Sequence, residues 1–409
     1  MTPAEGRDGR LYGTSPSGSD FSLSLSGNLD VLHLFGSTGG ANPFAGLTLG
    51  TDGNFYGTTS AGGTGQNGNL YRISPQGTFT ALHNFLGGSD GASPLSPPIE
   101  GADGNFYGTT NGNAGNPATI YKYSPSSGAT STLYQFDSLH ALQVQFALVQ
   151  GSDGYLYGVA ELGGANGLGS VFKVSTSGEL VFCHSFTGKE NGANPFGPLI
   201  EASDGLFYGM TNSGGVKGYG TIFKMDREGH ISTFFRFKPP TAVYPLGGLM
   251  QGSDGYLYGA LWENTLPNLG SLFRISLSGQ YQQLYNFTAT VGESAVTALL
   301  QHTNGAFYGS AEYGGEFGYG TIYTLDMHLP PFITFVRRNG KVGQSAQILG
   351  QGLKGATAVT FNGIPATSFS VETDTFMTAV VPSGATTGPV VVTTATGTLT
   401  SNVNFQILK

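Results

Sequence analysis

One motif occurs seven times along the chain, and its regular spacing limits the possible folds. The motif reads DGxxYG, with asparagine in place of aspartate in the last copy. Successive tyrosines are separated by 44, 51, 50, 51, 50 and 50 residues: Tyr12, Tyr56, Tyr107, Tyr157, Tyr208, Tyr258 and Tyr308. A period of this kind predicts one supersecondary unit per repeat.

Each unit contains four short extended segments. In the fifth copy they read NPFGPLIEA, LFYGM, GTIFKM and ISTFFRF, separated by Asp-Gly, a longer loop and the turn DREG. Asp-Gly between apolar runs predicts a hairpin, because glycine readily adopts the positive φ that a tight turn needs. Seven four-stranded antiparallel units predict an all-β fold, a seven-bladed β-propeller over residues 1–329, in which ring closure protects the sheet edges.

The first and last copies are atypical. Only residues 2–5 precede the first turn, and no fourth strand is evident after TIYTL in the seventh copy. We therefore expect a seventh blade of three strands. We also expect a trimmed or mature chain from which an export signal and the ring-completing residues have been removed.

Residues 330–409 follow a different pattern, and Pro330-Pro331 marks the boundary. Short apolar-polar alternations such as VTF, FMTAVV and VVVTT are separated by glycine and proline. About seven strands in eighty residues predict a small immunoglobulin-like β-sandwich.

The charge distribution argues against nucleic acid as a partner. Residues 1–329 carry 12 basic and 23 acidic side chains, and residues 330–409 carry 5 and 2. Neutralising phosphates requires clustered Lys and Arg, which the large domain lacks. We expect no membrane span, because no apolar run is long enough.

Other features of composition bear on cofactors and location. The single Cys183 cannot form an internal disulfide, and no His, Cys and carboxylate spacing resembles a metal site. We expect no cofactor and no metal, and a monomer. Few charges with abundant Gly, Ser, Thr and Asn are typical of secreted bacterial proteins, so we expect a secreted or cell-surface location.

Two family resemblances follow from these motifs. The DGxxYG and GGxxxxGxxFK elements resemble the GloVer tandem repeats of bacterial secreted proteins over residues 1 to about 326. The C-terminal GKVGQSAQILGQGL, TAVTFNG, ATSF and VPSGATTGPVVVTT resemble an IPT/TIG immunoglobulin-like domain. The first resemblance implies a repeat fold without an assigned catalytic motif. The second implies an accessory module of extracellular enzymes or receptors.

The strand order predicts two distinct faces. The Asp-Gly turns and the SPQG-type turns flank the second and third strands from the same end, so they share one face. The loops after YG and the loops between blades share the opposite face. Long loops on a rigid scaffold are where binding and catalysis concentrate, so we expect the site there.

Residues that break the repeat are the candidates for function, because residues present in every copy are best explained as scaffold. Three positions after YG, the copies read Pro16, Ser60, Asn111, Glu161, Asn212, Trp262 and Glu312. Aromatic rings beside carboxylates suit a sugar, since the ring stacks on C–H groups and the carboxylate binds hydroxyls or acts as an acid or base. The catalytic candidates are Glu312, Glu263 and Glu161. The substrate-binding candidates are Trp262, Tyr313, Glu316, Lys217, Tyr219, Asn212 and His140.

Three functions remain open. The first is cleavage of an extracellular polysaccharide, by a glycosidase with Glu263 and Glu312 about 5 to 10 Å apart or by a lyase that binds the substrate carboxylate through Lys217, His140 or Lys189. The second is lectin-like glycan binding without catalysis, and the third is a surface interaction scaffold. For each candidate the alternative is an ordinary solvated loop residue.

Overall fold

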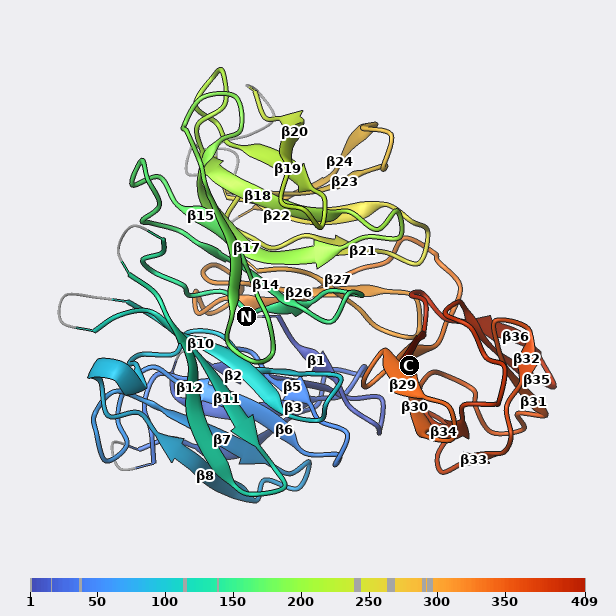
Figure 1. Cartoon of the computed structure of the whole chain (residues 1–409). Coiled ribbons are helices and arrows are strands. Elements are labelled where there is room, and N and C mark those ends of the chain that lie inside the picture. The colour runs from blue at the N-terminus through green and yellow to red at the C-terminus, as the bar shows by residue number, and fades with distance from the viewer. Residues whose placement is uncertain are drawn as a thin grey trace.

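The computed structural model describes residues 2–15, 17–36, 39–112, 116–137, 140–238, 244–262, 269–288, 292 and 297–408. In these residues it contains 37 strands and one short 3₁₀ helix, η1 (Gly88–Asp90). The prediction of an all-β chain is therefore confirmed. Figure 1 shows the strands of the repeat region and the separate C-terminal segment.

Seven antiparallel sheets follow one another in chain order, and we number them repeat sheets 1 to 7. Repeat sheet 1 contains β1 (Ala4–Glu5), β2 (Leu11–Ser15), β3 (Ser19–Leu23) and β4 (Leu29–Leu34), and repeat sheet 2 contains β5 (Thr48–Leu49), β6 (Phe55–Thr59), β7 (Asn69–Ile73) and β8 (Phe79–Asn84). Repeat sheet 3 contains β9 (Ile99–Glu100), β10 (Phe106–Thr110), β11 (Thr119–Ser124) and β12 (Ala129–Gln135), and repeat sheet 4 contains β13 (Val149–Gln150), β14 (Leu156–Ala160), β15 (Ser170–Val174) and β16 (Leu180–Ser185). Repeat sheet 5 contains β17 (Ala193–Glu201), β18 (Phe207–Ser213), β19 (Thr221–Met225) and β20 (Ile231–Arg236), and repeat sheet 6 contains β21 (Met250–Gln251), β22 (Leu257–Leu261), β23 (Ser271–Ile275) and β24 (Tyr281–Asn286). Repeat sheet 7 contains β25 (Leu300–Gln301), β26 (Phe307–Ala311) and β27 (Thr321–Leu325). Repeat sheet 7 thus has three strands among the described residues, and the other six have four.

The repeated motif builds the hairpin of each sheet. In six sheets the YG tyrosine donates its hydroxyl hydrogen bond to the aspartate four residues earlier, at 2.7 to 3.0 Å. The glycine after the tyrosine lies against the aromatic ring of the third strand. At Gly209, an added Cβ would lie 2.5 Å from the Phe223 ring. The motif is therefore scaffold, as its repetition predicts.

Consecutive sheets are joined by an inter-sheet clasp. A Glu or Gln at the end of the first strand accepts a hydrogen bond from a backbone N–H in the turn of the preceding sheet. The pairs are Glu100 with Thr51 (2.7 Å), Gln150 with Ala102 (2.8 Å), Glu201 with Ser152 (2.8 Å), Gln251 with Ser203 (2.8 Å), Gln301 with Ser253 (2.7 Å) and Glu5 with Thr303 (2.9 Å). The last of these connects the first sheet to the seventh.

Repeat sheet 2 is the exception, because Leu49 occupies its clasp position. Leu49 is buried in a cluster with Leu349 and Phe376, which belong to the C-terminal segment. A segment remote in sequence therefore packs where the clasp is missing.

The C-terminal segment forms two four-stranded sheets, β28-β30-β34-β33 and β32-β31-β35-β36, and a two-stranded pair, β29-β37. Their bounds are β28 (Thr334–Phe335), β29 (Asn339–Lys341), β30 (Ser345–Leu349), β31 (Ala358–Phe361), β32 (Ile364–Pro365), β33 (Phe369–Val371), β34 (Phe376–Val380), β35 (Val390–Thr394), β36 (Gly397–Thr400) and β37 (Gln406–Leu408). These ten strands exceed the seven that the sequence predicts, because several are only two or three residues long. The segment has its own core around Ile348, Val359 and Met377.

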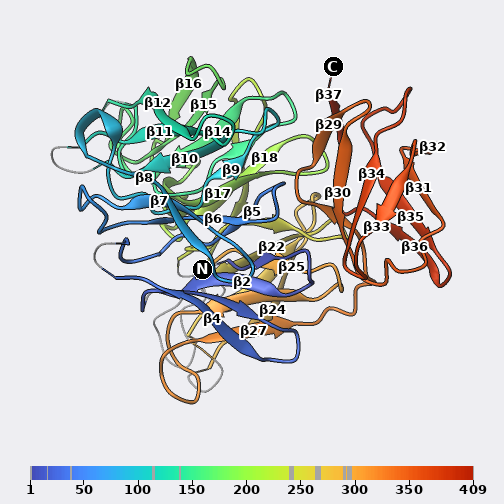
Figure 2. The same ribbon diagram turned by 90° about the horizontal axis from the view of Figure 1, so that it is seen from below.

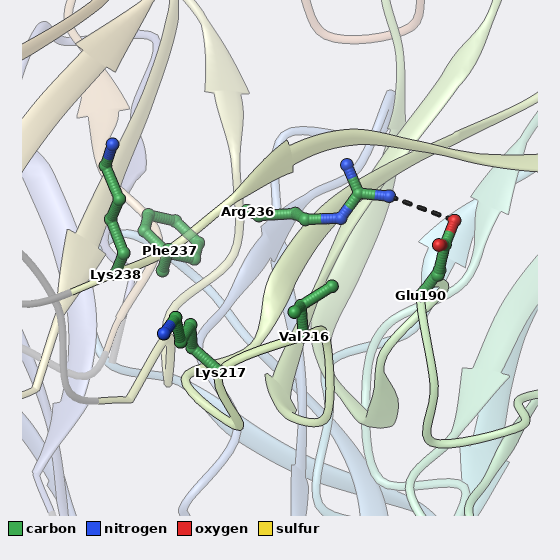
Figure 3. A pocket seen from close by; sticks show the side chains of 6 residues that line it. All are labelled: Glu190, Val216, Lys217, Arg236, Phe237 and Lys238. Carbon is green, nitrogen blue, oxygen red and sulfur yellow. Dashed lines mark hydrogen bonds and ion pairs between the residues drawn. The ribbon is translucent and has the colours of Figure 1, made fainter.

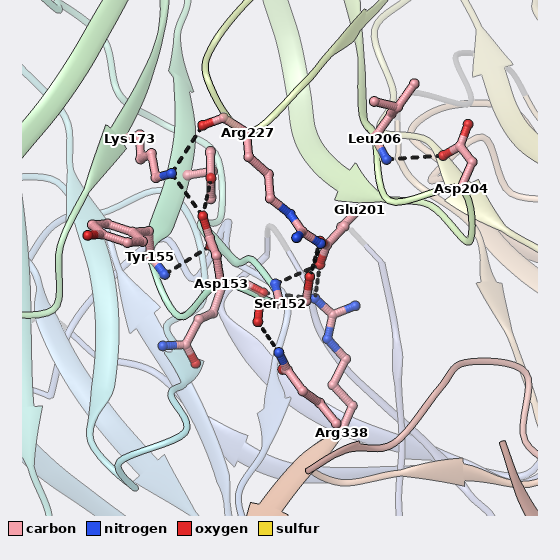
Figure 4. Close-up of polar contacts among 12 residues, drawn as sticks. Ser152, Asp153, Tyr155, Lys173, Glu201, Asp204, Leu206, Arg227 and Arg338 are labelled. Carbon is pink, nitrogen blue, oxygen red and sulfur yellow. Dashed lines mark hydrogen bonds and ion pairs between the residues drawn. The ribbon is translucent and has the colours of Figure 1, made fainter. Parts of the chain in front are cut away.

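The C-terminal segment lies against the tight-turn face, which we define by the Asp-Gly turns (Figure 2). Arg338 lies 3.2 Å from the clasp carboxylate of Glu201 and donates to the Gln150 carbonyl at 2.8 Å, and Arg337 lies 3.4 Å from Glu100. Arg227 also contacts Glu201, at 3.0 Å (Figure 4). Two arginines therefore compensate one buried carboxylate.

Candidate functional site

The strand register places the long loops opposite the C-terminal segment. In repeat sheet 2, Phe55 at the start of β6 pairs with Ile73 at the end of β7, so the tight turns lie at one end of the sheet. The loops after the second strands lie at the other end. We define the long-loop face by these loops, which include residues 60–68, 161–169, 214–220 and 312–320.

A hollow of about 440 Å³ lies in the loops of repeat sheet 5 (Figure 3). Its lining residues come from three segments: the connection between β16 and β17, the loop between β18 and β19, and the end of β20. They are Glu190, Val216, Lys217, Arg236, Phe237 and Lys238. The hollow therefore depends on residues that are almost fifty positions apart in the chain.

Hydrogen bonds fix the frame of this hollow. The Glu190 carbonyl accepts from the Thr233 hydroxyl at 2.7 Å, and the Phe237 N–H donates to the Gly220 carbonyl at 3.3 Å. The Phe237 side chain is almost fully buried, whereas Val216 is exposed. The hollow thus has an anchored aromatic base and an accessible apolar side.

The charge of the hollow is positive. Lys217, Arg236 and Lys238 line it with one carboxylate, Glu190, which lies 3.2 Å from Arg236. This differs from the excess of acidic residues in the region as a whole. Clustered cations favour an anionic ligand, because charge-assisted hydrogen bonds to carboxylate or sulfate are stronger than neutral ones.

Three sequence candidates from repeat sheet 5 have different surroundings. Lys217 lines the hollow. Tyr219 is half-buried and packs against the core cluster that contains Phe237. Asn212 lies within β18 and is also half-buried.

The acidic candidates lie on separate repeat sheets. Glu161 follows β14 and is half-buried, and burial raises the pKa of its carboxyl. Its carboxylate accepts a hydrogen bond from the Gln145 side chain. Glu312 follows β26 and is exposed, and its bond with the Tyr313 hydroxyl raises the pKa of that tyrosine. No hydrogen bond or ion pair joins Glu161 to Glu312 in the described part of the chain.

The remaining candidates fall into different settings. Trp262 forms an isolated β-bridge with Tyr244, and their ring centroids are 5.6 Å apart. His140 lies 2.6 Å from Asp137, and its carbonyl accepts from Ser170 at 2.6 Å.

Three further candidates belong to exposed or undescribed loops. Glu316 and Tyr313 are exposed in the loop after β26. Glu263 lies outside the described residues.

Glu190, Arg236, Lys238 and Tyr244 are not among the candidates predicted from the sequence. A signal for two of them was present, because Arg236 and Lys238 flank the repeated phenylalanine of the fourth strand. The other copies have no cation at either position.

The residues that the structure describes contain neither a candidate metal-binding cluster nor a candidate membrane-spanning helix. Those residues contain no group of three or more His, Cys, Asp and Glu side chains placed to hold a metal ion. They also include no helix with the length and apolar character needed to cross a membrane.

Solved structures with similar folds have low sequence identity. A putative 6-phosphogluconolactonase from Bacteroides uniformis has a TM-score of 0.52 at 14% identity, over 77% of this chain and 94% of its own. An oligogalacturonate lyase from Vibrio parahaemolyticus has a TM-score of 0.46 at 12% identity, over 80% and 88%. TolB from Acinetobacter baumannii has a TM-score of 0.42 at 13% identity, over 68% of this chain and 64% of its own, so the match spans less than two thirds of TolB. The first likeness supports a fold of the β-propeller type.

No curated protein matches the sequence. The model of the Gloeobacter/Verrucomicrobia repeat matches residues 2–117 and 97–323, well over half of the chain. These residues include all seven YG motifs and all seven repeat sheets except the last two residues of β27. The chain belongs to the Gloeobacter/Verrucomicrobia repeat family.

Proposed function

We propose that the repeat sheets are the blades of one closed seven-bladed β-propeller over residues 1–329. The bond between Glu5 and Thr303, which links the first sheet to the last, supports this. We also propose that residues 330–409 form an IPT/TIG immunoglobulin-like module. Two four-stranded sheets around a separate core support that proposal.

We propose that this protein binds an anionic polysaccharide at its long-loop face. The observation that carries the proposal is the hollow of repeat sheet 5, which is lined by Lys217, Arg236 and Lys238 and by one carboxylate, that of Glu190. A uronate carboxylate would lie among the cations, while the sugar ring would contact Val216. The aromatic pair Trp262 and Tyr244 offers a second stacking surface on the next sheet.

Binding measurements on the whole protein test this proposal. We expect polygalacturonate or alginate to bind saturably and to lose affinity with added salt, and neutral dextran not to bind. Lys217→Ala combined with Lys238→Ala should weaken binding about tenfold, because two charge-assisted contacts are lost. Lys341→Ala combined with Lys354→Ala is the matched control in the C-terminal segment. Equal binding of dextran, or no effect of the first pair, would refute the proposal.

Cleavage of the bound chain is the second candidate function. The half-buried Glu161 favours it, since burial raises the pKa of its carboxyl toward the range of a general acid. Incubation with the same polysaccharides should release new reducing ends if the protein is a hydrolase. If it is a lyase, the products should also show the absorbance of unsaturated uronates. Glu161→Gln, Glu263→Gln and Glu312→Gln would identify the acid involved. If none of these polysaccharides yields a product, cleavage is refuted and binding remains the proposed function.

We further propose that the protein is secreted or displayed on the cell surface and is a monomer. The low charged fraction of 10% together with the 67 glycines supports an extracellular location. Light scattering on the purified chain would test the monomer.

A further inference from the structure

An ion pair occupies one part of the hollow of repeat sheet 5. The Arg236 guanidinium points toward the Glu190 carboxylate, 3.2 Å away, whereas the ammonium groups of Lys217 and Lys238 lie away from it (Figure 3). Both side chains of the pair are accessible, since 45% of Arg236 and 77% of Glu190 is exposed. A ligand in the hollow would therefore meet two different surroundings, the two lysines and the ion pair.

The backbone fixes the positions of both partners of the ion pair. Arg236 is the last residue of β20. The Glu190 carbonyl accepts the hydroxyl of Thr233, also in β20, at 2.7 Å, and the neighbouring Lys189 carbonyl accepts the N–H of Gly215 at 2.8 Å. The segment that carries Glu190 is thus bonded both to β20 and to the loop between β18 and β19.

Repeat sheet 3 contains part of the same frame without the ion pair. There the Thr132 hydroxyl of β12 donates to the Ser89 carbonyl at 2.8 Å, which is the same bond as in repeat sheet 5. Ser89 stands in the place of Glu190, and Gln135 stands in the place of Arg236. This bond therefore forms without the two charges, so the ion pair is not needed to position the segment.

A carboxylate beside a guanidinium suits the hydroxyl group of a sugar, because a hydroxyl both donates and accepts hydrogen bonds. Glu190 can accept its proton while Arg236 donates to its oxygen. An anionic group in the same place would be repelled by Glu190 and would have to displace it from Arg236. Lys217 and Lys238 carry only donors, so they suit a carboxylate.

We propose that Glu190 is a specificity-determining residue, a role that rests on the anionic-polysaccharide binding proposed above. It selects a polymer that carries hydroxyl groups beside its carboxylates over a polymer that carries carboxylates alone. A uronate meets both requirements of the hollow, with its carboxylate at the two lysines and a hydroxyl at the ion pair. A polymer with acceptor groups alone meets the charge of Glu190 and gains no hydrogen bond from it.

The probes are polygalacturonate and polyacrylate of matched length, with binding to the whole protein measured at one salt concentration. Polyacrylate has the carboxylates without the hydroxyl groups. Glu190→Gln should strengthen polyacrylate binding about fivefold, because it removes a repulsive charge and releases Arg236. Polygalacturonate should bind no more tightly than to the wild type, because its charge-assisted hydroxyl bond to Glu190 is lost. The ratio of the two affinities should therefore fall about fivefold.

Two further variants separate this effect from a change in net charge. Glu228 is exposed in the turn between β19 and β20, at the opposite end of the same sheet. Glu228→Gln makes the same change in charge and should leave the affinity ratio within about twofold of the wild type. Combining Glu190→Gln with Arg236→Gln should abolish the gain in polyacrylate binding, because that gain requires the released guanidinium.

The outcomes distinguish this role of Glu190 from the proposed function itself. If the wild type binds polygalacturonate saturably but Glu190→Gln leaves the affinity ratio unchanged, Glu190 does not determine specificity and the binding function stands. An equal fall in the ratio with Glu228→Gln would also overturn the role, in favour of net charge. If the wild type binds neither polymer, the binding function is refuted together with the role of Glu190.

Discussion

Glu5 and Thr303 connect the two ends of the repeat region. The Glu5 carboxylate accepts the backbone N–H of Thr303 at 2.9 Å and its hydroxyl at 2.5 Å. His302 lies 3.3 Å away and is fully buried. Burial raises the pKa of Glu5, against the opposing effects of His302 and Thr303. The N–H and hydroxyl of Thr303 therefore give this buried carboxylate two hydrogen-bond donors.

Replacing Glu5 tests whether this clasp closes the repeat region. Glu5→Ala should lower the free energy of unfolding by about 3 kcal/mol, since the Thr303 N–H and His302 lose a buried partner. Glu5→Gln should cost less than about 1 kcal/mol, because glutamine makes the same clasp bond at three other sheets. Urea unfolding measures both. Similar losses for the two variants would contradict a role for the acceptor oxygen.

The buried carboxyl group of Asp20 should make the stability of the protein depend on pH. It occupies a position in β3 that is apolar in the other six sheets, and it accepts the Tyr71 hydroxyl at 2.8 Å. Burial raises its pKa from 3.8 to about 7, while the Tyr71 bond opposes the shift. The folded value is above the unfolded one, so stability present below pH 4 is lost as the pH rises through 7.

Unfolding at pH 4 to 8 tests this dependence. The wild type should lose up to about 4 kcal/mol relative to Asp20→Asn over that range. Asp326→Asn, at a largely exposed position, should follow the wild type. Parallel curves for the wild type and Asp20→Asn would show that Asp20 does not titrate in this range.

The contact between Arg338 and Glu201 should couple the stability of the repeat sheets to the C-terminal segment. Arg338→Ala should destabilise the protein by about 1 to 2 kcal/mol, because Glu201 keeps Arg227 but loses one of two compensating charges. Hydrogen exchange at the Ser152 amide, which bonds Glu201, should accelerate. Lys341→Ala, at an exposed position, is the control. Unchanged exchange at Ser152 would mean that the arginine does not support the clasp.

The close packing around Gly209 leads us to expect that no larger residue fits at the repeated glycine. An added Cβ would lie 2.5 Å from the Phe223 ring and 2.8 Å from Leu199. Gly209→Ala should therefore cost at least about 1 to 3 kcal/mol in denaturant unfolding. Gly36→Ala, where no atom lies within 4 Å, should be close to neutral. A neutral Gly209→Ala would show that the neighbouring rings can move aside.

The sequence by itself determined the local structure. The fifty-residue period and the Asp-Gly turns predicted the strands of each hairpin, because turn geometry and strand alternation depend on residues close together in the chain. The same repetition separated scaffold residues such as Tyr208 from variable ones such as Lys217. The sequence also predicted that no fourth strand follows β27.

Only the tertiary structure decided which distant residues meet. The hollow joins Glu190 to Arg236, and the C-terminal segment brings Arg338 to Glu201. The raised pKa of Asp20 likewise depends on burial among neighbours that the chain order does not specify. Each of these features arises from contacts between separate segments, and charge and burial at such contacts are set by how the sheets pack, which short-range sequence patterns do not encode.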